Sequence, residues 1–247
     1  MKIAIIGYGQ MGKLLERLAL AQGWEVTSII DPTLGNEISE ETIGNADVCL
    51  DFTLPTAVMD NARKIAALKK NLVIGTTGWQ EHLLEMAQLA KANKVGIIYG
   101  SNFSIGMNTF FLLVEKASKL MNQLPQYDTF GYEMHHNNKQ DSPSGTAKSL
   151  AKIVTDNLDR KSESQFEKLD RKIRAEEFHL ASIRSGNIPG THLIGFDSTA
   201  DTIELKHTAR NREGFAQGAL QAAAWVNNKT GLYDFQEIFF EILMDKA

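Results

Sequence analysis

The chain is poor in cysteine, with Cys49 as its single one among 247 residues. One cysteine excludes an intramolecular disulfide framework and suits a reducing compartment. The sequence also lacks a basic excess, since 26 Lys and Arg stand against 30 Asp and Glu, so it has no electrostatic footprint for nucleic acid. No apolar stretch approaches a membrane span, and the first residues lack a signal-peptide pattern because Gly9 and Gly12 interrupt the apolar run. We therefore expect a cytoplasmic protein that binds neither nucleic acid nor membrane.

Short, nearly continuous apolar runs alternate with helical patterns over the first 103 residues. Continuous rather than alternating hydrophobicity is typical of strands in a parallel sheet that is covered on both faces. These runs cover residues 2–7, 26–30, 46–52, 71–75 and 95–100. Strands that alternate with helices indicate right-handed βαβ units. The sequence therefore predicts an α/β fold with a Rossmann-type doubly wound parallel sheet.

The patterns after residue 103 mix helices and strands in a different order. Helical patterns cover 106–124, 144–158 and 212–228, and strand patterns cover 127–136, 179–186, 190–198 and 201–209. A densely charged run between them, residues 159–177, predicts either a solvated helix or a surface excursion. We predict a dinucleotide-binding domain over 1–103, completed by 213–247. An α+β domain over 104–212 is inserted into it or appended to it.

A glycine motif follows the first predicted strand. Gly7, Gly9 and Gly12 form G-x-G-x-x-G at the start of a helical pattern. In this motif the first glycine permits a tight turn, the second lets a pyrophosphate approach, and the third lets helix and strand pack closely. The helix start then offers free N–H groups to phosphates. These features indicate dinucleotide binding, whereas the alternative is a glycine turn in an α/β protein that binds no nucleotide.

Asp31 ends the second predicted strand, where a carboxylate can accept hydrogen bonds from an adenosine ribose. Its charge favours the free 2′-hydroxyl of NADH, because a 2′-phosphate would bring two like charges together. Pro32 and Thr33 follow, so no adjacent arginine is available for a 2′-phosphate, although Lys13 is near enough in sequence to help. We expect NADH as the cofactor, with NADPH as the alternative.

Two later loops, GTTGW from Gly75 and GSNFS from Gly100, follow predicted strands. Ligands of open α/β sheets bind at the carboxyl ends of the strands, and small residues there would let a nicotinamide and its ribose lie against backbone. Ordinary turn chemistry explains either loop equally well.

The segment EMHHNNKQDSPSGTA, residues 133–147, is polar and rich in chemistry. Ser144, Gly145 and Thr146 precede a helical pattern, so their N–H groups offer a site for a carboxylate. Lys139 adds a positive charge, and a histidine can transfer a proton near neutral pH. Together they predict a substrate with carboxylates that accepts a hydride and a proton. The alternative is a polar loop with a helix cap.

Metal binding and nucleophilic catalysis are less favoured by the same segment. His135 and His136 are adjacent on a strand pattern, so they point to opposite faces and would not chelate one ion together unless the strand ends there. Ser144 stands in P-S-G-T rather than G-x-S-x-G, and Cys49 lies in an apolar strand with no local partner motif. We expect no metal.

The polar segment resembles the signature of the 4-hydroxy-tetrahydrodipicolinate reductase (dihydrodipicolinate reductase) family, E-x-H-H-x-x-K-x-D-[AS]-P-S-G-T-A, at every fixed position. The likeness continues in the glycine loop, DFTLP, GTTG, SNFSIG, RSGNIPGTH and the F-A-x-G-A helix. This resemblance implies reduction of 4-hydroxy-tetrahydrodipicolinate to tetrahydrodipicolinate with NADH or NADPH, in the diaminopimelate route to lysine. It also implies that residues 104–212 form a mixed-sheet domain that binds the substrate and builds a homotetramer.

The resemblance further implies roles for single residues. His135 would be the proton donor and acceptor, Lys139 the proton donor, and His136, Gly145 and Thr146 the substrate contacts. The implied cofactor contacts are Gly7, Tyr8, Gly9, Gln10, Met11, Gly12, Asp31, Gly75, Thr76, Thr77, Gly100, Ser101, Asn102 and Phe103.

The sequence does not decide the roles of three residues, and it leaves two other functions as alternatives. Asp141 is expected either to orient Lys139 or to cap the turn, and Arg210 and Arg212 are candidates to assist the site. Another nicotinamide-dependent reductase of a small carboxylic acid would use the same two-domain plan. A protein that senses NADH without turnover is a further alternative, although it would need no proton donor such as Lys139.

Overall fold

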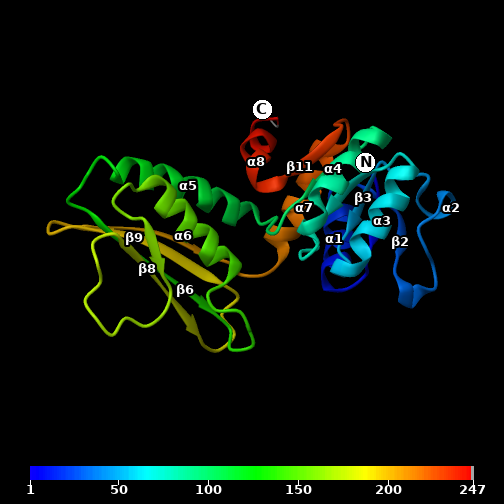
Figure 1. The fold of residues 1–247 in the computed structure, drawn as a ribbon. Helices are drawn as coiled ribbons and strands as arrows, with labels where there is room; N and C mark the ends of the chain where they lie inside the picture. The colour runs from blue at the N-terminus through cyan, green and yellow to red at the C-terminus, as the bar shows by residue number, and fades with distance from the viewer. Residues whose placement is uncertain (246–247) are drawn as a thin grey trace. The chain divides into compact units, whose positions relative to one another are not determined.

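The computed structural model describes residues 1–245 of the chain and contains two compact units (Figure 1). The first unit comprises Met1–Ile105 and the chain from Arg212 onward, and the second comprises Gly106–Asn211. The predicted domain boundaries, after residue 103 and before residue 213, lie within two residues of these divisions. Within the described residues, no helix has both the length and the apolar character that crossing a membrane requires.

The first unit is built on a parallel six-stranded sheet with the order β2-β1-β3-β4-β5-β11. Its strands are β1 Lys2–Ile6, β2 Glu25–Ile30, β3 Val48–Asp51, β4 Asn71–Ile74, β5 Gly96–Tyr99 and β11 Gly231–Asp234. Its helices are α1 Gln10–Ala21, α2 Glu40–Ile43, α3 Pro55–Ala67, α4 Leu83–Asn93, α7 Glu213–Val226 and α8 Phe235–Met244, with 3₁₀ turns η1 Pro32–Leu34 and η2 Gln80–His82. The predicted Rossmann-type sheet is confirmed, whereas β11, α2 and α8 were not predicted.

Helices cover both faces of this sheet, as continuous apolar strands require. One core joins strand residues such as Cys49 to α3 and α4 through Ile65 and Met86. Helices α1 and α7 pack beside each other and contact the central strands. Helix α7 is rich in small residues because it lies very close to the chain after β5. A Cβ built on Gly218 would lie 1.8 Å from the carbonyl oxygen of Phe103.

The second unit contains a mixed five-stranded sheet with the order β10-β9-β6-β8-β7. Its strands are β6 Asp128–His135, β7 Glu163–Gln165, β8 Glu177–Arg184, β9 Thr191–Asp197 and β10 Thr202–Thr208. Strand β6 runs antiparallel to β9 and parallel to β8. Helices α5 Ile105–Met121 and α6 Gly145–Asn157 lie side by side on one face (Figure 1). Their core includes Val114, Val154 and Phe178, each fully buried.

Among the described residues, no helix of this unit covers the other face of the sheet. Side chains alternate along a strand, so Phe130, Tyr132 and Met134 of β6 point away from the helices. These three side chains are half-buried. Ile183 of β8 pairs with Met134 across the sheet and is 45% exposed. The open face therefore presents apolar side chains, and we refer to these four residues as the open sheet face.

The charged run over residues 159–177 forms an excursion and not a helix; it contains the short strand β7 and ends at the first residue of β8. The buried carboxylate of Glu177 ties the excursion together. Its Oε2 accepts hydrogen bonds from the Arg171 guanidinium at 2.9 Å and from the backbone N–H of Arg174 at 2.8 Å. Lys161, also buried, lies 2.6 Å from Asp128 Oδ1 and donates to the carbonyl of Ala175. The high charge therefore serves internal ion pairs as well as solvation.

Candidate functional site

A cavity of about 450 Å³ lies at the carboxyl ends of β1, β2 and β3. Because these strands are parallel, the loops that follow them meet at one edge of the sheet. The chain places β2 and β3 on opposite sides of β1, and ligands of open α/β sheets bind at such a switch point. The lining includes Gly7, Gly9, Asp31, Thr53 and Lys64.

The three glycines of the motif have the geometry that a pyrophosphate site requires. Gly7 has a φ of 90°, which favours glycine, and a Cβ on Gly12 would lie 2.2 Å from the carbonyl oxygen of Gly7. A Cβ built on Gly9 would meet no described atom within 4 Å, so the backbone there is open to a ligand. Helix α1 begins at Gln10 with no side-chain cap, which leaves its first N–H groups available to an anion. These residues fit a dinucleotide.

Asp31 follows β2 at the edge of the cavity and is held in place by hydrogen bonds. Its Oδ1 accepts from the backbone N–H of Thr33 at 2.9 Å, and its Oδ2 accepts from that of Tyr8 at 2.7 Å. Bonds from Thr33 and Tyr8 lower the pKa of Asp31, so its carboxylate is negative at neutral pH. Glu37 and Lys64 also line the cavity, and Lys64 Nζ lies 2.8 Å from Asp60 Oδ2. The one lysine or arginine among the residues that line this cavity is therefore already paired.

The loops after β4 and β5 combine exposed residues with packing residues. Thr77 and Ser101 are exposed, as ligand contacts should be. Gly75 has a packing role, because a Cβ there would lie 2.1 Å from the Phe52 ring. Phe103 is 3% exposed, and its ring centroid lies 4.6 Å from that of Phe235. Its side chain therefore packs in the core of the first unit.

The remaining predicted residues of this unit lie around the same loops. Thr76 donates to the carbonyl oxygen of Thr53 at 3.1 Å, and Asn102 accepts from the backbone N–H of Ser104 at 2.9 Å. The Arg212 guanidinium donates to Gln10 Oε1 at the start of α1, which places Arg212 beside the glycine loop.

In the second unit, the end of β6 and the start of α6 form a polar site. Strand β6 ends at His135, and a turn in which Lys139 N–H donates to the His136 carbonyl at 3.1 Å follows it. Ser144 caps α6 by accepting the Ala147 N–H at 3.1 Å. Gly145 is exposed, and a Cβ built on it would meet no atom within 4 Å. The space around Gly145 at the start of α6 is therefore open, and the carboxylate site expected there stays a prediction.

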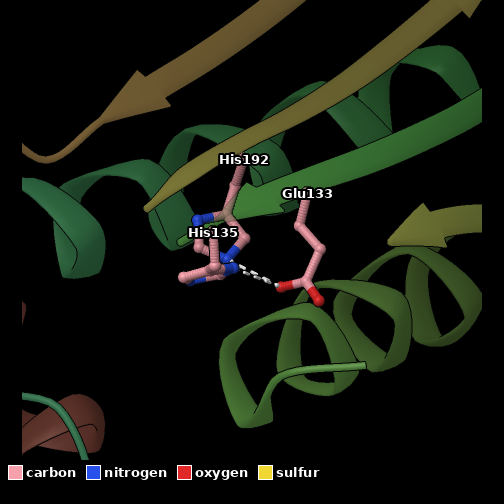
Figure 2. Close-up of side chains that lie close together, drawn as sticks. All are labelled: Glu133, His135 and His192. Atoms are coloured by element: carbon pink, nitrogen blue, oxygen red, sulfur yellow. Dashed lines mark ion pairs between the residues drawn. The ribbon is translucent and has the colours of Figure 1, made fainter. Parts of the chain in front are cut away.

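Glu133 lies under this site with its side chain fully buried. Its Oε1 accepts hydrogen bonds from Ser144 N at 2.9 Å, Ser182 Oγ at 2.8 Å and Arg184 at 2.9 Å. Its Oε2 accepts the Ser144 hydroxyl. Figure 2 shows the two imidazoles that approach the same oxygen. His135 Nδ1 lies 3.3 Å from Oε2, and His192 Nε2 lies 3.4 Å from it.

Burial and charge set the protonation of this cluster in opposite directions. Burial alone would raise the pKa of Glu133, but the donors His192, Ser144 and Arg184 outweigh it and hold that pKa far below its usual range. Burial lowers the pKa of His135 to about 4, against the opposing effect of the Glu133 carboxylate. Glu133 is therefore ionised at neutral pH, while the His135 imidazole is neutral.

Sequence reasoning did not assign Glu133, Arg184 or His192 to the site. Their assembly depends on strand register, because Glu133 pairs with His192 on β9 and with Ser182 on β8. The signal available in the sequence was limited to the signature glutamate and the R-S-G-N-I-P-G-T-H run, whose ends are Arg184 and His192.

Within residues 1–245, one group of three or more potential metal ligands has its ligand atoms within 4.8 Å of one another. It comprises Glu133, His135 and His192. Arg184 places a permanent positive charge 2.9 Å from Glu133 Oε1, and that charge opposes a cation there. Cys49 is buried in β3, where burial raises the pKa of its thiol to about 12. A protonated, inaccessible thiol is neither a nucleophile nor a metal ligand.

Models of one protein family match nearly the whole chain. The model described as "Dihydrodipicolinate reductase, N-terminus" matches residues 1–103, and "Dihydrodipicolinate reductase, C-terminus" matches residues 106–239. Two relatives carry the name 4-hydroxy-tetrahydrodipicolinate reductase. The one from Christiangramia forsetii is 33% identical over 243 residues, covering 98% of this chain and 99% of the relative. The one from Buchnera aphidicola subsp. Schizaphis graminum is 34% identical over 265 residues, covering 96% of each.

Solved structures give the same result for the fold. The dipicolinate-bound dihydrodipicolinate reductase from Paenisporosarcina sp. TG-14 is 25% identical, with a TM-score of 0.76 over 96% of this chain and 99% of that one. An amine dehydrogenase from Mycobacterium smegmatis, 12% identical, has a TM-score of 0.60 over 94% of each chain and shares the fold alone.

Proposed function

Because this chain belongs to the dihydrodipicolinate reductase family, we propose that it reduces 4-hydroxy-tetrahydrodipicolinate to tetrahydrodipicolinate in the diaminopimelate route to lysine. One observation supports the proposal. His135 ends β6, Lys139 lies in the turn that follows, and the open start of α6 at Gly145 comes after that turn, an order that would suit two proton-transfer groups beside a site for a carboxylate. The dipicolinate bound by the similar reductase is a small dicarboxylate, the kind of ligand this arrangement suits.

The proposed cofactor is NADH in preference to NADPH. The ionised Asp31 carboxylate and Glu37 both line the cavity, and a 2′-phosphate would be repelled by them. Lys64 and Lys13 are the cations nearby, but Lys64 pairs with Asp60 and Lys13 lies over the Tyr8 ring. The open backbone at Gly9 and the start of α1 would hold the pyrophosphate. When bound, the nicotinamide supplies the hydride.

The proposed roles of the chain's own residues follow from chemistry. The N–H groups at Gly145 and Thr146 would hold a substrate carboxylate at the positive end of α6, with the Gly145 N–H exchanging its present partner, the Asp141 carboxylate, for the substrate. Lys139 Nζ would donate a proton where negative charge develops, and His135 would exchange a proton through Nε2. His136, half-buried and beside this turn, would contact the substrate.

We also propose a homotetramer, formed through the open sheet face, and a cytoplasmic location. The open sheet face supports the first, since exposed apolar patches of this kind mark association surfaces. The free thiol of Cys49 suits the second.

The test is turnover by the purified full-length chain. Freshly generated 4-hydroxy-tetrahydrodipicolinate is added with NADH or NADPH, and loss of reduced-cofactor absorbance is followed. Rapid oxidation of either cofactor is expected. Oxidation only with other small oxo acids would favour a different reductase. NADH binding without turnover on any of these compounds would favour a sensor.

A further inference from the structure

The buried carboxylate of Glu133 has an arrangement that a purely structural residue does not need. Four hydrogen bonds from Ser144, Ser182 and Arg184 already satisfy its two oxygens. Two imidazoles, those of His135 and His192, still approach Oε2 at 3.3 and 3.4 Å. Their rings pack edge to face with centroids 5.1 Å apart. Neither approach is an aligned hydrogen bond, because His135 Nδ1 and His192 Nε2 both lack a hydrogen-bond partner among the described residues, so the carboxylate acts on the two rings through its charge.

The nitrogen of His135 that faces Glu133 bears on the tautomer of this imidazole. An ionised carboxylate attracts an N–H and repels a lone pair, so at 3.3 Å its charge favours a proton on the nitrogen that faces it. For neutral His135 this favours the proton on Nδ1 and the lone pair on Nε2. Nε2 lies beside Gly190, where an added Cβ would be 3.2 Å away. The absence of a side chain at Gly190 keeps this nitrogen uncovered.

We propose that Glu133 is the positioning residue of the site, which fixes His135 as the Nδ1–H tautomer so that Nε2 exchanges the proton of the reaction. His192 is the second group on the same oxygen and limits rotation of the His135 ring. This inference rests on the proposed function for the meaning of the proton transfer. The tautomer itself is a property of the ligand-free chain and can be measured without substrate.

Charged groups on each neighbouring element act on His135. Glu133 on its own strand favours the protonated imidazole, whereas Lys139 in the following turn, Arg184 on β8 and His192 on β9 oppose it. Removing the Glu133 charge leaves only opposing charges around the imidazole. The His135 titration must then move to lower pH.

The first measurement uses the wild-type protein with ¹⁵N-labelled histidine, without ligands, by NMR. His135 signals are assigned by their loss in His135→Asn. The expected result is a protonated Nδ1 and an unprotonated Nε2 at neutral pH. The opposite tautomer would overturn the proposal whether or not the protein turns over the proposed substrate.

The second measurement compares Glu133→Gln with two matched variants. In Glu133→Gln we expect the His135 titration to move to lower pH and kcat to fall about 10²-fold, within the range general acid–base catalysis supplies, with NADH affinity unchanged. Ser182→Ala removes a donor to Oε1 only, and Glu177→Gln removes another buried carboxylate of the same unit, so neither should move the titration. A folded Glu133→Gln with wild-type titration and kcat would overturn the proposal. If that variant does not fold, the wild-type tautomer decides.

Discussion

Lys139 Nζ lies 2.7 Å from Asp141 Oδ1 in the turn between β6 and α6. The sequence left open whether Asp141 orients Lys139 or caps the turn, and the structure shows the ion pair. The pKa of Asp141 is lowered first by its bond with Lys139, with smaller effects that include the Gly145 N–H. Asp141 therefore joins the ammonium group to the start of α6, where the substrate carboxylate is proposed to bind.

Lys139→Met should remove most turnover while the protein still binds NADH. The change keeps the aliphatic stem and removes the proton, and general acids contribute about 10²–10⁴-fold to rate. Steady-state kcat and NADH affinity by fluorescence titration check both parts. Asp141→Asn is the matched control: its pair with Lys139 is half-exposed and worth at most about 1 kcal/mol, so kcat should fall less than about tenfold. Weak NADH binding in Lys139→Met would contradict the assigned role.

Gly9→Ala and Gly12→Ala should separate cofactor binding from folding. A methyl group on Gly9 meets no described atom, so this variant should keep wild-type thermal stability and lose at least about tenfold in NADH affinity, or 1.4 kcal/mol, because the pyrophosphate needs that space. A methyl group on Gly12 collides with the Gly7 carbonyl, which should cost about 1–3 kcal/mol of stability. Thermal unfolding measures the stability of both variants, and NADH titration measures their affinity for the cofactor. Tight NADH binding by Gly9→Ala would show that the pyrophosphate does not bind at this loop.

Asp31→Ser should reduce NADH affinity more than NADPH affinity. Hydrogen bonds to a charged group are worth about 1.5–3 kcal/mol, so the loss for NADH should be about ten- to a hundredfold. NADPH should bind no worse, because a repelling charge has gone. Dissociation constants for both cofactors measure the difference, with Glu37→Gln, which lines the same cavity, as the control. Equal losses for both cofactors would show that Asp31 does not contact the ribose.

Elements of the fold were predictable where the sequence pattern is local, and they were not predicted where they depend on distant parts of the chain. Strands β1 to β5 are visible in the sequence as apolar runs between helical patterns. Strand β11 has only the residues GLYD, all half-buried, and becomes a strand by pairing Gly231 with Gly96 at the edge of β5. That pairing joins distant parts of the chain, so no local pattern indicates it.

The same distinction holds for the site. The turn with Lys139 and the cap at Ser144 are adjacent in sequence and were predicted from it. The approach of His192 to Glu133 depends on how β6 and β9 pair, and a shift of one residue would turn either side chain to the other face. The role proposed for the Glu133 carboxylate therefore could not be inferred until the strand pairing was known.

Acid should weaken the fold partly through Glu177. Hydrogen bonds from Arg171 and Arg174 hold the pKa of Glu177 well below its usual range, while in the unfolded chain it is about 4.3. A lowered folded pKa means that this stabilisation is complete above about pH 4.3 and is lost progressively as pH falls below it. Glu177→Gln should therefore be less stable than wild type at about pH 7, with a gap that narrows below about pH 4. Urea unfolding at several pH values measures the gap, and Glu163→Gln, an exposed partner of Arg174, should change little. A gap that does not depend on pH would contradict this account.

Ile183→Lys should dissociate the proposed tetramer. Ile183 is 45% exposed on the open sheet face, and a lysine there would have to bury its charge in any interface that covers this face. Leu120 is the matched control, because it is 61% exposed on α5, on the opposite side of the same sheet. Leu120→Lys should keep the wild-type mass by light scattering, whereas Ile183→Lys should give smaller species that remain folded by circular dichroism. A wild-type mass for Ile183→Lys would place the interface elsewhere.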